Sequence, residues 1–189
     1  MLAAILLALG AVTFQPVTPA TTSQPSDVFV RDASAQAQPG PGGHVWGIRP
    51  PTGGDPDTVP LLNANGDPLK AVLGIWRTAD GNLQVTPGPK GERVRAVFHH
   101  LIADGRYSLF LRQLAGGTGA VFTPLDVTGM ANSFSADDQG NAEAVVSSPL
   151  ALPPGTQVVL IYHSDGTDHA SSLGNPGINA HTQLIARLP

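Results

Sequence analysis

The hydrophobic pattern is clearest at residues 157–163, where β-branched, aliphatic and aromatic side chains follow the turn residues Pro153, Pro154 and Gly155. Apolar side chains occupy both alternating sets of positions in this run, which is typical of a strand buried on two faces. A further strand is expected at about residues 180–188. The pattern therefore predicts two C-terminal strands, the first of them central in a sheet.

Runs with alternating polar and apolar positions fill much of the remaining chain. In residues 92–100, Val94, Ala96 and Phe98 fall on one face, and residues 106–114 alternate in the same way. An Ala-Asp-Gly turn between these two runs predicts a hairpin. Further strands are predicted at residues 44–48, 71–77, 82–86, 133–136 and 141–147.

About eight or nine short strands with frequent turns, and no convincing amphipathic helix, predict an all-β fold. The expected architecture is an antiparallel two-sheet β-sandwich of immunoglobulin-like or jelly-roll style. We assign this sandwich to residues 44–189, a length that allows one domain with an ordinary core. The preceding residues 36–43 are rich in glycine and proline and are expected to form a flexible linker.

Residues 1–35 form a separate segment in front of this linker. Residues 1–14 are an apolar run, short for a membrane span and suited to a signal peptide, although no basic residues precede it. Ala33-Ser34-Ala35 has the small-x-small pattern that signal peptidase cuts. We therefore expect a secreted, periplasmic or cell-surface protein that contacts a membrane only through this segment before cleavage. The alternative is an uncleaved apolar N-terminal arm.

Composition and motifs narrow the functional classes. The formal net charge is −4 with only ten Lys and Arg residues, which argues against nucleic-acid binding because that binding depends on neutralising phosphates. The sequence has no cysteine, which excludes disulfides, thiolate metal ligands and a cysteine nucleophile. The nucleophile-elbow pattern Gly-x-Ser-x-Gly does not occur either. A noncatalytic role is therefore favoured over an enzyme.

The two C-terminal strands place histidines at their adjoining ends. If the strands pair antiparallel with His163 opposite His181, then Leu160 lies opposite Leu184, and both histidines fall on the more polar face. Directly opposed β-carbons lie about 4.5–5.5 Å apart, which is close enough for two imidazoles to share one ion. This register predicts a metal site at the end of the two strands.

The loop between these strands offers further ligands in Asp165, Asp168 and His169. Imidazole and carboxylate groups together suit copper or zinc. The predicted metal ligands are His163, His169, His181, Asp165 and Asp168. The alternative interpretation is ordinary turn chemistry, because Ser164-Asp165-Gly166 is a common turn sequence and the histidine spacing matches no established metal motif.

The sequence DGRYSL at residues 104–109, together with the histidine-rich C-terminal strands, resembles secreted sandwich domains, including copper-binding and superoxide-dismutase-like ones. The defining histidine motif of those enzymes is absent from this chain. No family is therefore assigned from the sequence.

Two classes of function follow. The first is an exported noncatalytic β-sandwich module that binds a transition metal through the histidine-rich C-terminal hairpin. The second is a structural surface or filament subunit whose N-terminal arm docks on a neighbouring subunit, with Val28-Phe29-Val30 adding a strand to an exposed sheet edge. The expected partners are accordingly another copy of the chain or a cell-surface partner.

Overall fold

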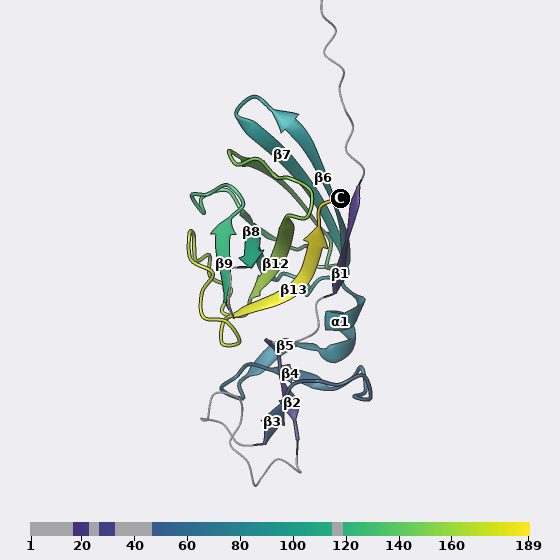
Figure 1. The fold of residues 1–189 in the computed structure, drawn as a ribbon. Coiled ribbons are helices and arrows are strands. Elements are labelled where there is room, and N and C mark those ends of the chain that lie inside the picture. Colours follow the sequence, from purple (N-terminus) through teal and green to yellow (C-terminus); the bar gives the residue numbers. More distant parts are fainter. Residues whose placement is uncertain (1–16, 23–26, 33–46, 115–118) are drawn as a thin grey trace, which may run out of the picture.

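The computed structural model describes residues 17–22, 27–32, 47–114 and 119–189. Figure 1 shows a large curled sheet with a smaller group of strands and a short helix at its foot. The strands pair antiparallel throughout both parts. The predicted all-β antiparallel sandwich fold is therefore confirmed.

In the described part of the chain, nine strands form the large sheet, in the order β10-β8-β12-β13-β1-β6-β7-β11, with β9 also paired to β8. Their bounds are β1 Thr18–Thr22, β6 Asp80–Gly88, β7 Gly91–His99, β8 Arg106–Leu114, β9 Ala120–Pro124, β10 Ser133–Ser135, β11 Ala142–Ser148, β12 Gln157–His163 and β13 Ala180–Arg187. The smaller part contains β2 Val30–Arg31, β3 Ile48–Arg49, β4 Pro60–Leu62, β5 Pro68–Val72 and α1 Leu73–Thr78.

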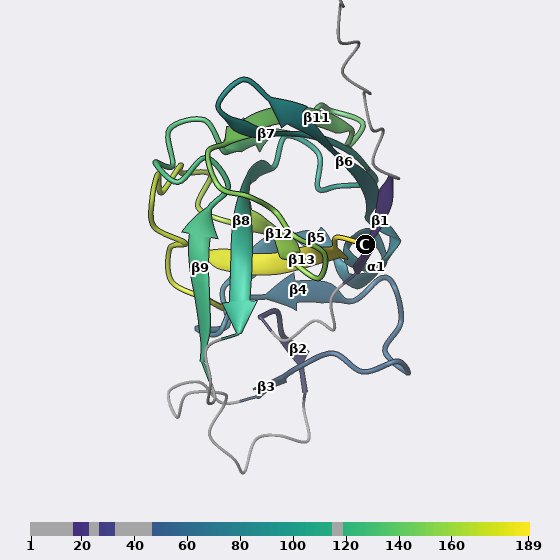
Figure 2. The same cartoon turned by 45° about the horizontal axis from the view of Figure 1, so that its top comes forward.

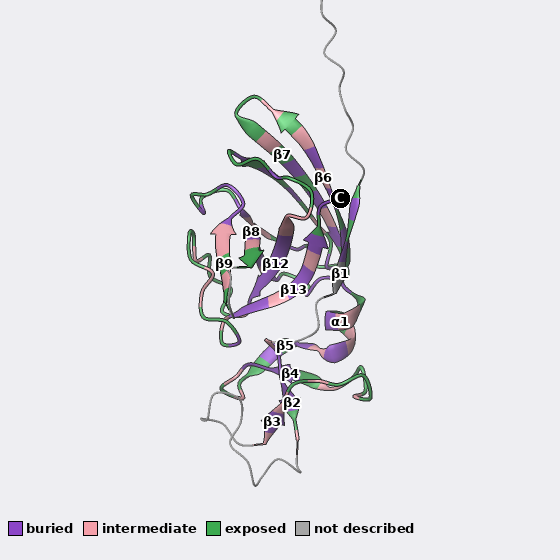
Figure 3. Ribbon diagram, viewed as in Figure 1, coloured by how far each residue is buried: buried purple, intermediate pink, exposed green. Residues whose placement is uncertain are grey.

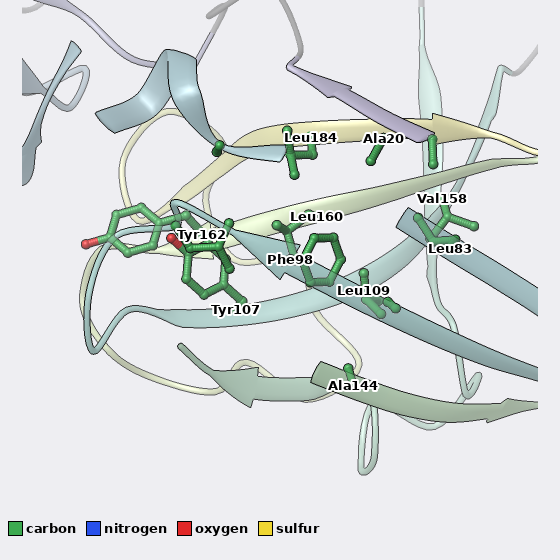
Figure 4. Packing of buried hydrophobic residues seen from close by; sticks show 14 of the residues in the cluster. Ala20, Leu83, Phe98, Tyr107, Leu109, Ala144, Val158, Leu160, Tyr162 and Leu184 are labelled. Carbon is green, nitrogen blue, oxygen red and sulfur yellow. The ribbon is translucent and has the colours of Figure 1, made fainter. Parts of the chain in front are cut away.

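The large sheet curls so that its two halves enclose the main hydrophobic core (Figure 2). β10 and β11 stand at opposite ends of the strand order and nevertheless lie close together. Phe98 from one half packs in the same cluster as Leu109, Leu160 and Leu184 from the other, and each is only 1% exposed (Figure 4). Burial of these side chains provides the main driving force for the curled shape.

A second, smaller apolar cluster lies on the outer face of β8, β12 and β13. Its buried members are Phe110, Val159, Ile161 and Ala180. β9 and the loop after β12 pack against it, so almost the whole length of β12 is buried (Figure 3). The prediction of a central strand with two buried faces is therefore confirmed.

The predicted register between β12 and β13 is correct over half of its length. Leu160 lies opposite Leu184, as expected, but a β-bulge follows between Leu160 and Ile161. Beyond the bulge, His163 lies opposite Ala180 and not opposite His181. Since a shift of one residue moves a side chain to the other face of a sheet, the prediction that the two histidines face each other is wrong.

Part of the chain in front of the expected domain boundary at residue 44 belongs to the large sheet. β1 lies between β13 and β6 in the middle of the strand order, with Ala20 opposite both Ala186 and Gly81. Ala20 also packs in the main core. The β-structure therefore includes part of residues 1–35, which the sequence predicts to be a separate segment.

Val28, Phe29 and Val30 are also part of the folded chain. They are 0%, 5% and 0% exposed, and Phe29 forms a bridge with Leu62 of β4. The residues suggested for docking on a neighbour are thus buried within their own chain. The apolar run at 1–14, the cleavage motif at 33–35 and the linker at 36–43 lie outside the described residues.

Two local predictions are wrong. The strand expected at residues 71–77 ends at Val72 and continues as α1, in which Leu73 and Trp76 are buried. The hairpin expected between β7 and β8 does not form, because the buried Leu101 and Ile102 carry the chain from one half of the sheet to the other.

The described helix, α1, has six residues. Across the described ranges of the chain, no helix combines the length and apolar character needed to cross a membrane.

Candidate functional site

The loop at residues 164–179 joins β12 to β13 and carries Asp165, Asp168 and His169. It folds back against the sheet, where Leu173 packs on the outer apolar cluster. Gly174 has a φ of +85°, and a β-carbon at this position would come within 3.3 Å of the His169 ring. Glycine therefore lets the loop pack closely beside this histidine.

His163 ends β12 and is only 1% exposed. Its Nε2 lies 2.6 Å from Ser108 Oγ on the neighbouring β8. Its Nδ1 is buried and has no hydrogen-bond partner among the described residues. Burial, with a further contribution from the nearby His169, lowers the pKa of His163 to about 4, so its imidazole is neutral at physiological pH.

His169 and Asp165 form a contact beside His163. The rings of His163 and His169 have centroids 5.1 Å apart, and His169 Nε2 lies 3.0 Å from Asp165 Oδ2. Asp165 also accepts hydrogen bonds from Asn179 Nδ2 and from the Thr167 N–H. Partial burial alone would raise the pKa of Asp165, but these hydrogen bonds and the His169 contact outweigh it and lower the pKa.

Asp168 lies in the same loop but is held by other groups. Its carboxylate accepts hydrogen bonds from Arg106 Nη2 at 2.9 Å, Ser133 Oγ at 3.0 Å and the Ala170 N–H at 2.9 Å. Partial burial favours a higher pKa for Asp168, whereas these hydrogen bonds and the charge of Arg106 lower it overall. Asp168 is therefore ionised and already paired with a cation.

His181 lies on the inner face of the sheet, whereas His163 lies on the outer face. Its ring packs edge-on to Trp76, with centroids 6.5 Å apart, and lies beside Tyr162. Nε2 lies 3.0 Å from Ser164 Oγ, and Nδ1 lies 2.6 Å from the carbonyl oxygen of Asp27. Burial lowers the pKa of His181, and the contacts with Asp27 oppose that shift only in part. Both ring nitrogens therefore have partners within the fold.

The structure thus brings together four of the five predicted ligands. In the ranges that the structure describes, no three His, Asp or Glu side chains already lie where they could hold one metal ion. A hollow of about 260 Å³ borders His163, Asp165 and Arg106. The hollow therefore borders part of the cluster, whereas Nδ1 of His163 is itself buried.

Sequence reasoning missed the residues that hold this cluster in place. Ser108 contacts His163, Asn179 contacts Asp165, and Arg106 pairs with Asp168. The sequence signal for Ser108 was its place as the one polar residue in the run 107–111, and the structure shows that it is 2% exposed. Asn179 and Arg106 gave none, since their roles depend on how the loop folds.

Comparison with known proteins adds little to this description. No protein-family model matches the chain, and no curated protein matches it. Among solved structures, the chain is similar to a Cu/Zn superoxide dismutase from Brucella abortus, with 11% sequence identity and a TM-score of 0.38 over 92% of this chain and 100% of the dismutase. A likeness this weak carries no information about the site. Fold and side-chain geometry alone define the class, an antiparallel β-sandwich in which one buried histidine lies beside a histidine and two carboxylates of the following loop.

Proposed function

We propose that this chain is an exported, noncatalytic β-sandwich module that binds one transition metal ion, zinc or copper, through His163, His169 and Asp165. The observation that carries the proposal is the buried Nδ1 of His163, which lacks a hydrogen-bond partner among the described residues. A buried polar atom without a partner costs about 1–3 kcal/mol. A metal ion bound to this nitrogen removes that cost.

The spacing of the two imidazole rings suits a shared ion. Two imidazoles on one tetrahedral ion, with metal–nitrogen bonds of about 2.1 Å, place their ring centroids about 5.2 Å apart. The centroids of His163 and His169 are 5.1 Å apart. The rings therefore need to turn, but do not need to separate or approach, to bind the same ion.

The contact between His169 and Asp165 points to the third ligand. A nitrogen and an oxygen on one tetrahedral ion lie about 3.4 Å apart, and His169 Nε2 and Asp165 Oδ2 are separated by 3.0 Å. Insertion of a divalent ion between them displaces the shared proton and requires a movement of a few tenths of an ångström. Asn179 then supports Asp165 as an outer partner.

Ser108 supports His163 in the same way. Histidine ligands usually donate their second ring N–H to an acceptor, which fixes the ring and selects the nitrogen that binds the ion. If Nε2 of His163 donates to Ser108 Oγ, the Nδ1 lone pair is free for a metal. Since burial keeps this imidazole neutral, protons compete weakly for it at physiological pH.

Asp168 is assigned a supporting role and not that of a primary ligand. Its ion pair with Arg106 already satisfies its charge, and coordination would require breaking that 2.9 Å contact. The pair holds the loop against β8 from outside the proposed ligand set. The proposed set thus leaves the fourth position to water.

Export is part of the proposal and rests on the apolar N-terminal run at residues 1–14. Cleavage after Ala35 is not part of the proposal, because it would remove β1 and Val28 to Val30, which pair and pack within the fold. The alternative of a surface or filament subunit has less support, because Thr18–Thr22 and Val28 to Val30 pair and pack within their own chain. We therefore propose metal binding as the function, ahead of a role as a surface or filament subunit.

The test is calorimetric titration of the chelator-treated protein with Zn²⁺ and, separately, with Cu²⁺. We expect one ion per chain, and we expect His163→Ala to abolish binding. The matched control is His99→Ala, which removes an exposed histidine that contacts Asn141 on the other half of the sheet. Failure of both ions to bind, or binding that survives His163→Ala in a folded variant, would overturn the proposal.

A further inference from the structure

A hollow of about 470 Å³ opens on the outer face of the sheet, between β9 and the loop after β12. Its wall is mainly apolar and includes Phe122 of β9, Ile161 of β12, Leu173 of the loop and Ile185 of β13. Ligand sites in proteins are typically hollows of about 300–1,000 Å³ with mostly apolar walls and a few polar groups. This hollow has the size and lining of such a site.

The floor of the hollow is built from paired strands. Ile161 and Ala180 line it and also belong to the outer apolar cluster, where they are 1% and 2% exposed. Both lie in strands that pair with neighbours along their length. A surface built on paired strands keeps its shape, which lowers the entropic cost of holding a ligand.

A single cationic group, Arg112 of β8, stands at the edge of the apolar wall. Its Nη1 donates to Gln157 Oε1 at 3.1 Å, and no carboxylate forms an ion pair with it in the part of the chain that the structure describes. A guanidinium has five N–H donors in a planar fork that matches a carboxylate in a bidentate contact. Arg112 therefore retains donors for an anionic ligand.

Asp27 lines the same hollow and limits which anions fit. Its carbonyl oxygen is engaged by His181, and its carboxylate lies 3.3 Å from the Thr182 nitrogen. A negative charge on the wall opposes a phosphate dianion about twice as strongly as a monoanion, and one guanidinium balances one negative charge. The charges thus favour a monoanion with an apolar body.

We propose that this hollow binds a small apolar carboxylate, with its hydrocarbon chain against Ile161 and Ile185 and its carboxylate on Arg112. The site is distinct from the proposed metal site, because Arg112 and the Arg106 that borders the metal cluster lie at opposite ends of β8. The inference does not depend on metal binding.

The test is calorimetric titration of the full chain with decanoate, in the presence of a chelator. We expect one molecule per chain with a dissociation constant below about 1 mM. Decanol, which has the same chain without the charge, is expected to bind about ten- to a hundred-fold more weakly, as expected for a lost charge-assisted hydrogen bond. No decanoate binding, or equal binding of decanoate and decanol, overturns the proposal.

Arg112→Gln separates the role of this residue from that of overall charge. We expect it to weaken decanoate about ten- to a hundred-fold and to leave decanol unchanged. The matched control is Arg93→Gln, which removes an exposed arginine on β7. Equal loss of decanoate affinity in both variants would attribute binding to net charge and contradict the assignment of Arg112.

A second variant tests the apolar wall. Ala120 is half-buried at the side of the hollow, so Ala120→Leu narrows the space without touching the main core. Decanoate and decanol should then both bind at least about ten-fold more weakly. Unchanged affinity for both ligands in this variant would place them elsewhere on the protein.

Discussion

His163 and His181 lie on opposite faces of the same pair of strands, and the comparison separates a structural histidine from a candidate ligand. Both are almost completely buried, and burial lowers the pKa of both. Both nitrogens of His181 have partners, whereas among the described residues His163 has a partner only at Nε2. Burial and charge state are thus alike, and hydrogen-bond satisfaction is what distinguishes the two sites.

The inner face is also completed by a segment of the chain, β1, that does not cover the outer face. β1 closes the gap between β13 and β6, and Ala20 covers the core near Leu83 and Leu184. The outer face is covered instead by β9 and the loop after β12. The two faces should therefore respond differently to truncation, substitution and acid.

The largest expected effect is deletion of residues 1–22, which removes β1 and leaves β13 and β6 with unpaired edges. We expect a loss of at least about 4 kcal/mol in the free energy of unfolding, or no cooperative transition in urea. Deletion of residues 1–14 is the control, because it keeps β1. Equal unfolding curves for the two truncations would contradict the position of β1.

His181→Ala should cost about 3 kcal/mol in the free energy of unfolding, because it leaves a cavity beside Trp76 and removes two hydrogen bonds. Zn²⁺ affinity of the folded fraction should not change. His163→Ala should show the reverse pattern, with lost metal binding and a smaller cost of about 1–2 kcal/mol. Urea unfolding and calorimetry of both variants give the comparison, and loss of metal binding in His181→Ala would contradict it.

Acid should lower the free energy of unfolding, because both histidines are buried and their pKa values are lowered. The pKa of His163 is about 4 in the folded protein, below its ordinary value of 6.5. Stability from the neutral imidazole is therefore fully present above pH 6.5 and is lost as the pH falls toward 4, by up to about 3 kcal/mol. The free energy of unfolding, measured in urea between pH 7 and pH 5, should fall less steeply in His163→Gln than in the unchanged protein. His99→Gln is the control, and a slope unchanged by His163→Gln would contradict a buried neutral imidazole.

The smallest effect on stability is expected for Ser108→Ala, which removes the partner of His163 Nε2. We expect a cost of about 1 kcal/mol and a Zn²⁺ affinity about 10–100-fold lower, because the ring loses its orienting contact. Ser133→Ala, which removes a hydrogen bond to Asp168, should lower metal affinity less. An equal effect of the two substitutions would place Asp168 among the ligands.

Strong hydrophobic patterns allowed the sequence to predict the strands that form the core. Residues 106–114 and 157–163 match β8 and β12, because long alternating or continuous apolar runs have few other stable arrangements. β1 has the sequence TPATT, with no apolar alternation and a proline, so only its pairing with β13 and β6 makes it a strand. α1 is too short to show a helical period.

The candidate site was predictable in its composition but not in its geometry. The sequence predicted that His163, Asp165, Asp168 and His169 lie close together, because they are close to one another along the chain. The bulge after Leu160, which sends His181 to the inner face, leaves no mark in the residues that form it. Ser108 and Arg106 reach the cluster only because β8 is the neighbour of β12, a pairing set by the whole sheet.

The most direct test of the central claim is a Zn²⁺ titration followed by NMR of the histidine ring nitrogens. We predict that the ring resonances of His163 and His169 shift in proportion to added zinc up to one ion per chain. Those of His181 and His99 should stay in place, because the first has both nitrogens occupied within the fold and the second lies on β7. Zinc-dependent shifts at His181, or none at His163, would contradict the distinction between the two faces.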